Sequence, residues 1–253
     1  MNSSISWTKA YVPDLDCTAQ EYMDAMTLSG TKVEGYTELD KNLDKIVVGK
    51  INKIEKHPDA DKLVICQVQI DEAGTEVQIV TGAPNVKEGD KVPVVLDGGH
   101  VASSHKDRES ENGFKIKKGK LRGVDSFGMM CSIDELGSNT DMYPDAAEDG
   151  IYILSDNPEY ADAPIGADAV ELLGLHDVVF EYEVTSNRVD CFGQIGIARE
   201  VAATFRKDLV LPEVTETGNG ENVNDYVSVE VQAPELCSRY VARIVKNIKL
   251  APS

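Results

Sequence analysis

The chain has 253 residues, 42% of them apolar and 27% charged, which is ordinary for a soluble globular protein and enough for two domains. It has no apolar run near the roughly 18 residues of a membrane span and no secretory signal at its start, so we expect a cytoplasmic protein without a membrane partner. The formal net charge of −19 argues against a surface that binds nucleic acid all over, although a local basic patch is compatible with it.

The first 40 residues predict an entry strand followed by one helix. The helix would begin after Thr18, because Glu21 stands three positions later in a capping-box pattern, and Gly30 is placed to end it. Tyr22 and Met26 would share one face of this helix.

From about residue 45 to 154 the sequence predicts short strands. Runs rich in β-branched residues, separated by Gly, Pro, Asn or Asp, occupy residues 45–54, 62–70, 76–82, 90–97, 113–121 and 150–154. Several short strands at this spacing are typical of a small closed barrel. The polar stretch at 100–113 would form a long hairpin tip.

Helical patterns return after residue 160. Residues 164–175 predict a short helix closed by Gly174, residues 177–184 a strand, and residues 193–205 an amphipathic helix. Because such material lies on both sides of the strand-rich block, the sequence favours one interrupted domain. We expect a discontinuous α+β domain over 1–40 and 155–207 and a barrel domain over 41–154.

The last part of the chain, 208–253, predicts a polar linker up to about residue 224 and then two strands at 226–232 and 238–250. Two strands cannot bury a face alone. We therefore expect them to be the start of a truncated sheet.

The motif HPDAD brings His57, Asp59 and Asp61 within five positions and could hold a metal or perform acid–base chemistry. The alternative is a polar turn before a strand, fixed by Pro58, in which the two carboxylates bond local backbone amides. No second His/Asp cluster supports a metal site, and the five scattered cysteines include no CxxC pair. The sequence favours the turn.

Residues 114–130, FKIKKGKLRGVDSFGMM, carry five cations and, up to Arg122, no acid. A strip of cations beside glycines is what a phosphate backbone can approach closely. The alternative is an edge strand whose lysines resist aggregation. Aromatic residues are scarce here, which favours recognition of the shape and backbone of a folded RNA over base stacking.

These residues resemble a known family. The stretch from VGKINKIEKHPDADKLVICQVQI through QIVTGAPNVKEGDKVPVVLDGG to FKIKKGKLRGVDSFGMMCSIDELG is similar to the tRNA-binding OB-fold domain of several synthetases and free-standing tRNA-binding proteins. The flanks ISWTKAYV, HDVVFEYEVTSNRVDCFGQIGIAREVAA and CSRYVARIVKNIKLAPS resemble the N-terminal third of the bacterial phenylalanine–tRNA ligase β subunit.

The resemblance implies an α+β protein in which an OB-fold barrel is inserted into a small helical–mixed, winged-helix-like domain. Residues 208–253 would be a linker and the first strands of the truncated editing region. The family is a heterotetramer of two α and two β subunits that charges tRNA with phenylalanine, using ATP and magnesium. This chain would carry no active site, metal site or cofactor of its own, and its partners would be tRNA and the α subunit.

Residue by residue, the resemblance and the basic run together give the candidate RNA contacts. They are His57, Lys62, Asn85, Lys115, Lys117, Lys118, Lys120, Arg122, Ser126, Gly128 and Met129. For Asn187, Arg188 and Asp190 we expect a structural role, with Asn187 or Asp190 capping the last helix and Arg188 pairing with an acid.

Three functions follow from these patterns. The favoured one is a non-catalytic tRNA-binding and assembly segment of the ligase β subunit, which supports ATP-dependent aminoacylation of tRNA(Phe). The second is a free-standing, structure-specific tRNA-binding or chaperone protein. The third, a metal-dependent enzyme built on HPDAD, has the least support.

Overall fold

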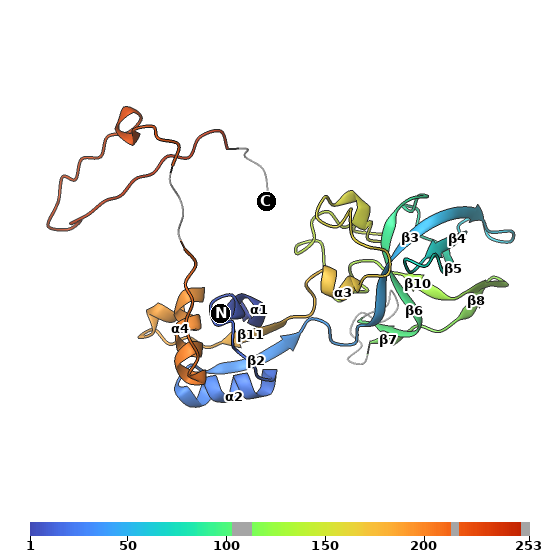
Figure 1. Ribbon diagram of the computed structural model, residues 1–253, viewed down its shortest axis with the longest axis horizontal. Helices are drawn as coiled ribbons and strands as arrows, with labels where there is room; N and C mark the ends of the chain where they lie inside the picture. The colour runs from blue at the N-terminus through green and yellow to red at the C-terminus, as the bar shows by residue number, and fades with distance from the viewer. Residues whose placement is uncertain (103–112, 214–217, 249–253) are drawn as a thin grey trace. The chain divides into compact units, whose positions relative to one another are not determined.

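The computed structural model describes residues 1–102, 113–213 and 218–248, and Figure 1 shows its course. The chain forms two compact units, Met1–Val210 and Leu211–Ser253. Most of the hairpin tip predicted at 100–113 lies outside the described residues. No helix among the described residues is both long enough and apolar enough to cross a membrane.

A three-stranded antiparallel sheet joins segments far apart in the first unit (Figure 1). Its strands, in the order β1-β11-β2, are β1 Asn2–Ser4, β11 Val178–Tyr182 and β2 Val33–Glu38. The elements beside it are α1 Ile5–Lys9, α2 Ala19–Ser29, the 3-10 turn η2 Val189–Cys191 and α4 Gln194–Phe205. The predicted helices over 19–29 and 193–205 are confirmed, whereas α1 and β2 were not predicted.

Helix α2 forms where its capping signals stand. The Thr18 side chain accepts from the Glu21 amide, the Glu21 carboxylate accepts from the Thr18 amide, and Gly30 ends the helix at φ 106°. Tyr22 and Met26 are buried and pack in a core that also receives strand β11 and helix α4. The ring of Tyr22 stacks on Phe180 with centroids 4.2 Å apart.

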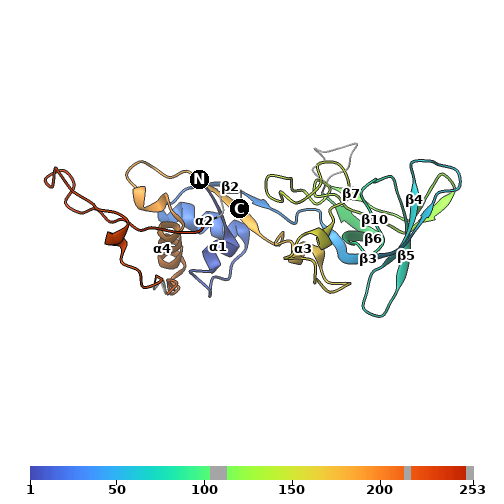
Figure 2. The same cartoon turned by 90° about the horizontal axis from the view of Figure 1, so that it is seen from above.

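The strand-rich part of the first unit contains a curled antiparallel sheet (Figures 1 and 2). The sheet order is β10-β6-β3-β4-β5, with β7 also pairing with β6, and β8 and β9 form a separate hairpin. The bounds are β3 Asp44–Lys56, β4 Val64–Gln69, β5 Glu76–Thr81, β6 Lys91–Val101, β7 Phe114–Lys115, β8 Gly119–Leu121, β9 Val124–Ser126 and β10 Gly128–Met130. The Phe127 amide donates to the carbonyl of Gln78 at 2.8 Å, which brings the β10 end of the sheet to β5.

Two strand predictions in this part were wrong. The run 113–121 splits into β7 and β8. The buried Ile116 still exchanges backbone hydrogen bonds with Gly98 and Gly99 of β6, and the chain leaves the sheet after it, at residues 117–118. The run 150–154 forms no strand, and its amides bond to separate partners, Ile151 to the Asn85 side chain and Tyr152 to the Cys131 carbonyl. The Cys131 amide donates to the Pro93 carbonyl, but Pro93 has no N–H to donate to the Cys131 carbonyl. The Cys131 carbonyl therefore accepts from the Tyr152 amide instead.

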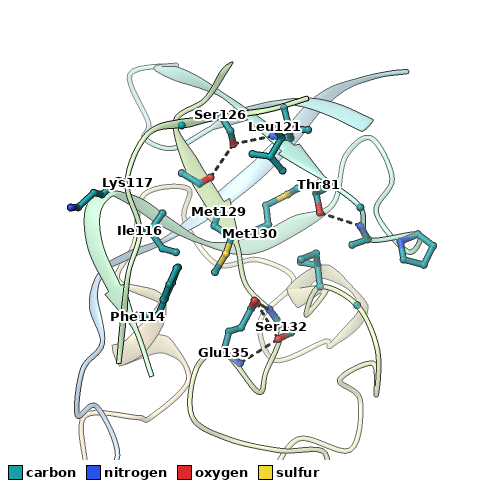
Figure 3. A pocket seen from close by; sticks show the side chains of 18 of the residues that line it. Thr81, Phe114, Ile116, Lys117, Leu121, Ser126, Met129, Met130, Ser132 and Glu135 are labelled. Carbon is teal, nitrogen blue, oxygen red and sulfur yellow. Dashed lines mark hydrogen bonds between the residues drawn. The ribbon is translucent and has the colours of Figure 1, made fainter. Parts of the chain in front are cut away.

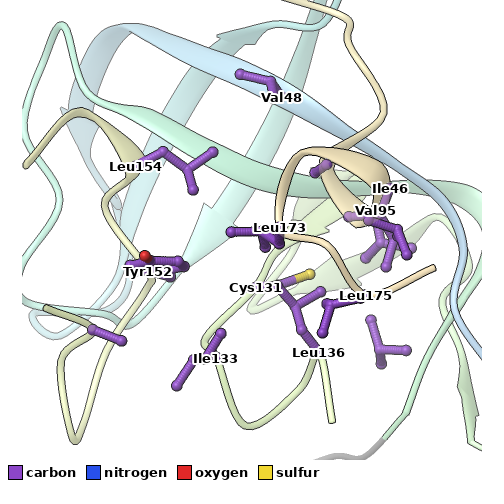
Figure 4. Close-up of a cluster of buried hydrophobic side chains, with 14 of the residues drawn as sticks. Ile46, Val48, Val95, Cys131, Ile133, Leu136, Tyr152, Leu154, Leu173 and Leu175 are labelled. Carbon is purple, nitrogen blue, oxygen red and sulfur yellow. The ribbon is translucent and has the colours of Figure 1, made fainter. Parts of the chain in front are cut away.

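Residues after the sheet complete its core. The short helix α3 Ala169–Leu172, capped by Asp168, and the 3-10 turn η1 Leu154–Asp156 lie in this part. Figure 4 shows Tyr152, Leu154, Leu173 and Leu175 packed with side chains of β3 and β6. The helix predicted over 164–175 and its closing Gly174, at φ 65°, are confirmed in a shorter form.

The second unit contains one regular element among its described residues, the 3-10 turn η3 Val223–Asp225. The strands predicted at 226–232 and 238–250 are not formed over 226–232 or over the described part, 238–248. The prediction of the first strands of a third sheet was therefore wrong for this chain. Two lone strands have too little apolar surface to bury against each other.

Candidate nucleic-acid interface

The basic segment, residues 115–122, lies on β7, β8, the chain between them and the first residue of the turn after β8. All five of its cations are exposed: Lys115, Lys117, Lys118, Lys120 and Arg122. Among the described residues, an acid lies within ion-pair distance of only one of them, with Lys120 Nζ 3.7 Å from Asp125 Oδ1 across the β8–β9 hairpin. The segment therefore presents mostly uncompensated positive charge.

Local backbone geometry fixes where the cations stand. Arg122 and Gly123, at φ 48° and 91°, form the two-residue turn between β8 and β9, so Arg122 lies at the hairpin tip. The chain bends before β8, where the Lys118 amide donates to Asp97 Oδ1 at 2.7 Å. Residues 116–118 thus connect β7 and β8 without regular strand structure.

His57 is buried, with 6% of its surface exposed. Its Nδ1 accepts from the Asp59 amide at 3.1 Å, so its Nε2 carries the proton and donates to the Leu121 carbonyl at 3.1 Å. The ring thereby ties the β3–β4 turn to the β8–β9 hairpin. The imidazole, rather than a carboxylate, bonds the local amide in HPDAD. Lys62 is exposed in the same turn.

Asn85 is half-buried and holds a backbone segment. Its side-chain Nδ2 donates to the Ile151 carbonyl at 2.8 Å, and its Oδ1 accepts from the Ile151 amide at 3.1 Å. Both ends of the amide are used inside the protein, so the geometry gives Asn85 a structural task.

Ser126, Gly128 and Met129 lie where β9 passes into β10. The buried Ser126 hydroxyl accepts from the Val80 amide at 3.1 Å and donates to the Gly128 carbonyl at 3.2 Å. A Cβ on Gly128 would stand 2.7 Å from the Val95 carbonyl oxygen, so only glycine lets β10 approach β6 this closely. Met129 is half-buried.

A cavity of about 900 Å³, here named the β10 pocket, opens beside these residues (Figure 3). Five of the predicted residues line it: Lys115, Lys117, Ser126, Gly128 and Met129. His57, Lys62, Asn85, Lys118, Lys120 and Arg122 are not part of the lining.

The lining also holds residues that sequence reasoning did not select as site residues. Phe114 is 50% exposed. Ser132 and Glu135 bond to each other reciprocally, with Glu135 Oε2 accepting from the Ser132 amide at 2.8 Å and from its hydroxyl at 3.1 Å. In the sequence, Ser-x-x-Glu resembles the capping box of a helix, so these two residues were not selected as site residues.

The described residues contain one group of side chains with metal-ligand spacing, Asp190, Cys191 and Glu200. Arg188 occupies it, with Nη2 2.8 Å from Asp190 Oδ2 and 2.7 Å from Glu200 Oε1. The guanidinium lowers the pKa of Asp190 to about 2, and burial raises the pKa of the Cys191 thiol to about 11. Magnesium does not suit this group, because the thiol is protonated and the negative charge of the carboxylates is already paired with Arg188.

The predicted ion pair of Arg188 is therefore confirmed. The predicted cap is wrong, since the N-cap residue of α4 is Gly193 and no side chain caps the helix. HPDAD does not form a metal-ligand group among the described residues.

The basic segment lies within the residues that match a known protein family. A family model described as "Putative tRNA binding domain" matches residues 46–150. Phenylalanine–tRNA ligase beta subunits are similar over the whole chain, with 44% identity over 250 residues in Geobacillus kaustophilus and 45% over 256 in Clostridium tetani. These alignments cover 99% and 100% of this chain but 29% of each relative, so the chain spans under a third of their length.

Solved structures give weaker likenesses. The C-terminal domain of Plasmodium vivax p43 matches with a TM-score of 0.26 and 24% identity, covering 37% of this chain and 48% of that one. A MetRS related protein from Pyrococcus horikoshii matches with a TM-score of 0.30 and 24% identity, covering 48% and 85%. At these TM-scores the likenesses carry no argument about fold.

Proposed function

The chain belongs to the phenylalanine–tRNA ligase beta subunit family, of which it spans a segment, and on this premise we propose that it is a non-catalytic tRNA-binding and assembly segment. It would support ATP-dependent aminoacylation of tRNA(Phe) as part of a full subunit. The activity, magnesium and ATP belong to the whole ligase in this proposal. The α subunit of an (αβ)2 heterotetramer would be its protein partner, in the cytoplasm.

The observation that carries the proposal is the exposed, mostly unpaired positive charge of the basic segment on a chain with a net charge of −19. A surface kept basic within an acidic protein suits a polyanion, because each phosphate contact releases counterions. The five cations lie within the residues that match the tRNA-binding family model. Lys62, exposed in the β3–β4 turn, is a further candidate phosphate contact.

For the fold, we propose an OB-fold barrel inserted into a winged-helix-like α+β domain. Strands β1, β2 and β11 support the discontinuous domain, because they form one sheet although the strand-rich part separates β2 from β11 in the sequence. The packing of Ala169, Val170 and Leu173 with side chains of β3 and β6 favours assigning residues 155–175 to the barrel rather than to the α+β domain. The segment from 208 would then be a linker into a further region of the subunit.

The decisive experiment changes Lys117, Lys118 and Lys120 together to Glu and measures tRNA binding by fluorescence anisotropy at several salt concentrations. We expect weaker binding to every tRNA alike, and a slope of log K against log salt reduced by about 2–3, as expected for three lost phosphate contacts. The matched control changes Lys9, Lys41 and Lys207, exposed lysines outside the matched residues, to Glu. Equal losses in both variants, or binding that is independent of salt, would contradict the proposal.

The free-standing tRNA-binding or chaperone protein is the alternative. The match to ligase beta subunits over 99% of the chain, including its helical flanks, disfavours this alternative.

A further inference from the structure

The β10 pocket has features that contact with an RNA backbone does not require. Phe114 stands half-exposed in its wall, next to the buried Ile116 and Met130 and the half-buried Met129 (Figure 3). An aromatic face and polarisable methionines form a surface on which a planar base can stack. The cavity, about 900 Å³, lies within the range of about 300–1,000 Å³ usual for small-ligand sites.

The charges of the pocket would also orient a nucleotide. Lys115 and Lys117 are exposed residues of the lining on the β7 side. Glu135, which lies apart from Lys117 in Figure 3, uses Oε2 for both bonds from Ser132, which leaves Oε1 as an acceptor. A carboxylate repels phosphate but accepts from an exocyclic amino group such as the cytosine N4.

From this arrangement we propose that the β10 pocket receives one unstacked nucleobase of the bound RNA, stacked on Phe114, with its exocyclic amino group toward Glu135 and its phosphate toward Lys115 and Lys117. The inference rests on the proposed tRNA-binding function and specifies a site within it. Bases inside a duplex cannot enter, since their faces are stacked and their edges paired. The ligand is therefore a base of a loop, a bulge or a single-stranded end.

The test uses the full chain and three RNA probes that share one stem: a hairpin with a cytidine loop, the same hairpin with a uridine loop, and the blunt duplex. Phe114→Leu keeps an apolar side chain but removes the aromatic face. We expect it to weaken binding of the cytidine hairpin about tenfold and to leave duplex binding unchanged. Phe114→Trp should restore the affinity.

Phe127→Leu is the matched control, because Phe127 is similarly exposed, at 42%, but does not line the β10 pocket. It should change no affinity. Glu135→Gln should shift the preference from the cytidine to the uridine loop. The new amide must turn its oxygen to the two Ser132 donors, so its NH₂ group faces the pocket and suits the uracil O4.

The outcomes separate this inference from the function on which it rests. Unchanged hairpin binding by Phe114→Leu, or an equal loss on the duplex, overturns the base pocket. If the Lys117, Lys118 and Lys120 variant then still loses affinity for all three probes, the tRNA-binding proposal stands without it. If that variant binds all probes normally, the proposed function fails whatever the result at Phe114.

Discussion

At the scale of single residues, the candidate RNA contacts divide by what their polar atoms already do. The ring nitrogens of His57 and the amide of Asn85 are bonded within the protein, whereas Lys62 and the cations of the basic segment are exposed. We therefore expect His57 and Asn85 to position the RNA-binding surface rather than to contact RNA.

Asn85→Ala tests this division. It leaves the amide and carbonyl of Ile151 without their side-chain partner, and we expect a loss of about 1–2 kcal/mol in the free energy of unfolding, measured with urea. tRNA affinity should stay the same while the protein is folded. Asn52→Ala, which removes an exposed bond to Glu76, is the control and should cost less than about 0.5 kcal/mol. Normal stability of Asn85→Ala with weaker tRNA binding would indicate that Asn85 contacts RNA.

Arg188 and Asp190 predict a pH dependence. The pKa of Asp190 is lowered from 3.8 to about 2, chiefly by its bonds to Arg188, so the ionised carboxylate stabilises the folded chain. That contribution is present above about pH 4 and is lost as pH falls toward 2. We expect the stability difference between wild type and Asp190→Asn, measured by urea unfolding, to shrink over this range.

Asp14→Asn, at an exposed carboxylate that is not a partner of Arg188, is the control. A wild-type advantage over Asp190→Asn that stays constant between pH 5 and pH 2 would show that the ion pair contributes nothing.

At the scale of elements, the close approach of β10 and β6 positions the residues of β10 that line the β10 pocket. A Cβ at Gly128 would stand 2.7 Å from backbone of β6, and backbone cannot move aside cheaply. We expect Gly128→Ala to destabilise the chain by about 1–3 kcal/mol in thermal unfolding. Gly35→Ala in β2 is the matched control, since its Cβ would meet nothing within 4 Å. Equal melting temperatures for the two variants would contradict this account.

Elements were predictable where the signal was local. The capping box at Thr18 and Glu21 and the stop at Gly30 predicted α2, because hydrogen bonds between near neighbours decide these ends. The run 113–121 was assigned one strand, because its residue types do not show that Asp97 draws the Lys118 amide out of the sheet. The prediction of a strand over 150–154 was wrong for a similar reason, since the hydrogen-bond partners of its amides lie on other segments.

At the scale of the whole molecule, charge is distributed unevenly. The chain has 44 acidic and 25 basic residues, yet residues 114–122 hold five cations and no acid. In the proposed function, the acidic remainder would lower the affinity of this chain for a polyanion, while the basic segment would set where contact is made. The related subunits are more than three times as long as this chain, so under the proposed function we expect the other parts of such a subunit to supply most of the tRNA affinity.

The sequence by itself determined the strand-rich block, its helical flanks, the basic segment and the family resemblance, because periodicity, capping and composition are encoded by neighbouring residues. Only the tertiary structure decided that His57 and Asn85 face inward and that Arg188 fills the acidic cluster. It also brought Phe114 and Glu135 into one pocket. Most of these outcomes depend on partners that are distant in the chain, such as Leu121 for His57 and Ile151 for Asn85, and residue type alone does not identify them.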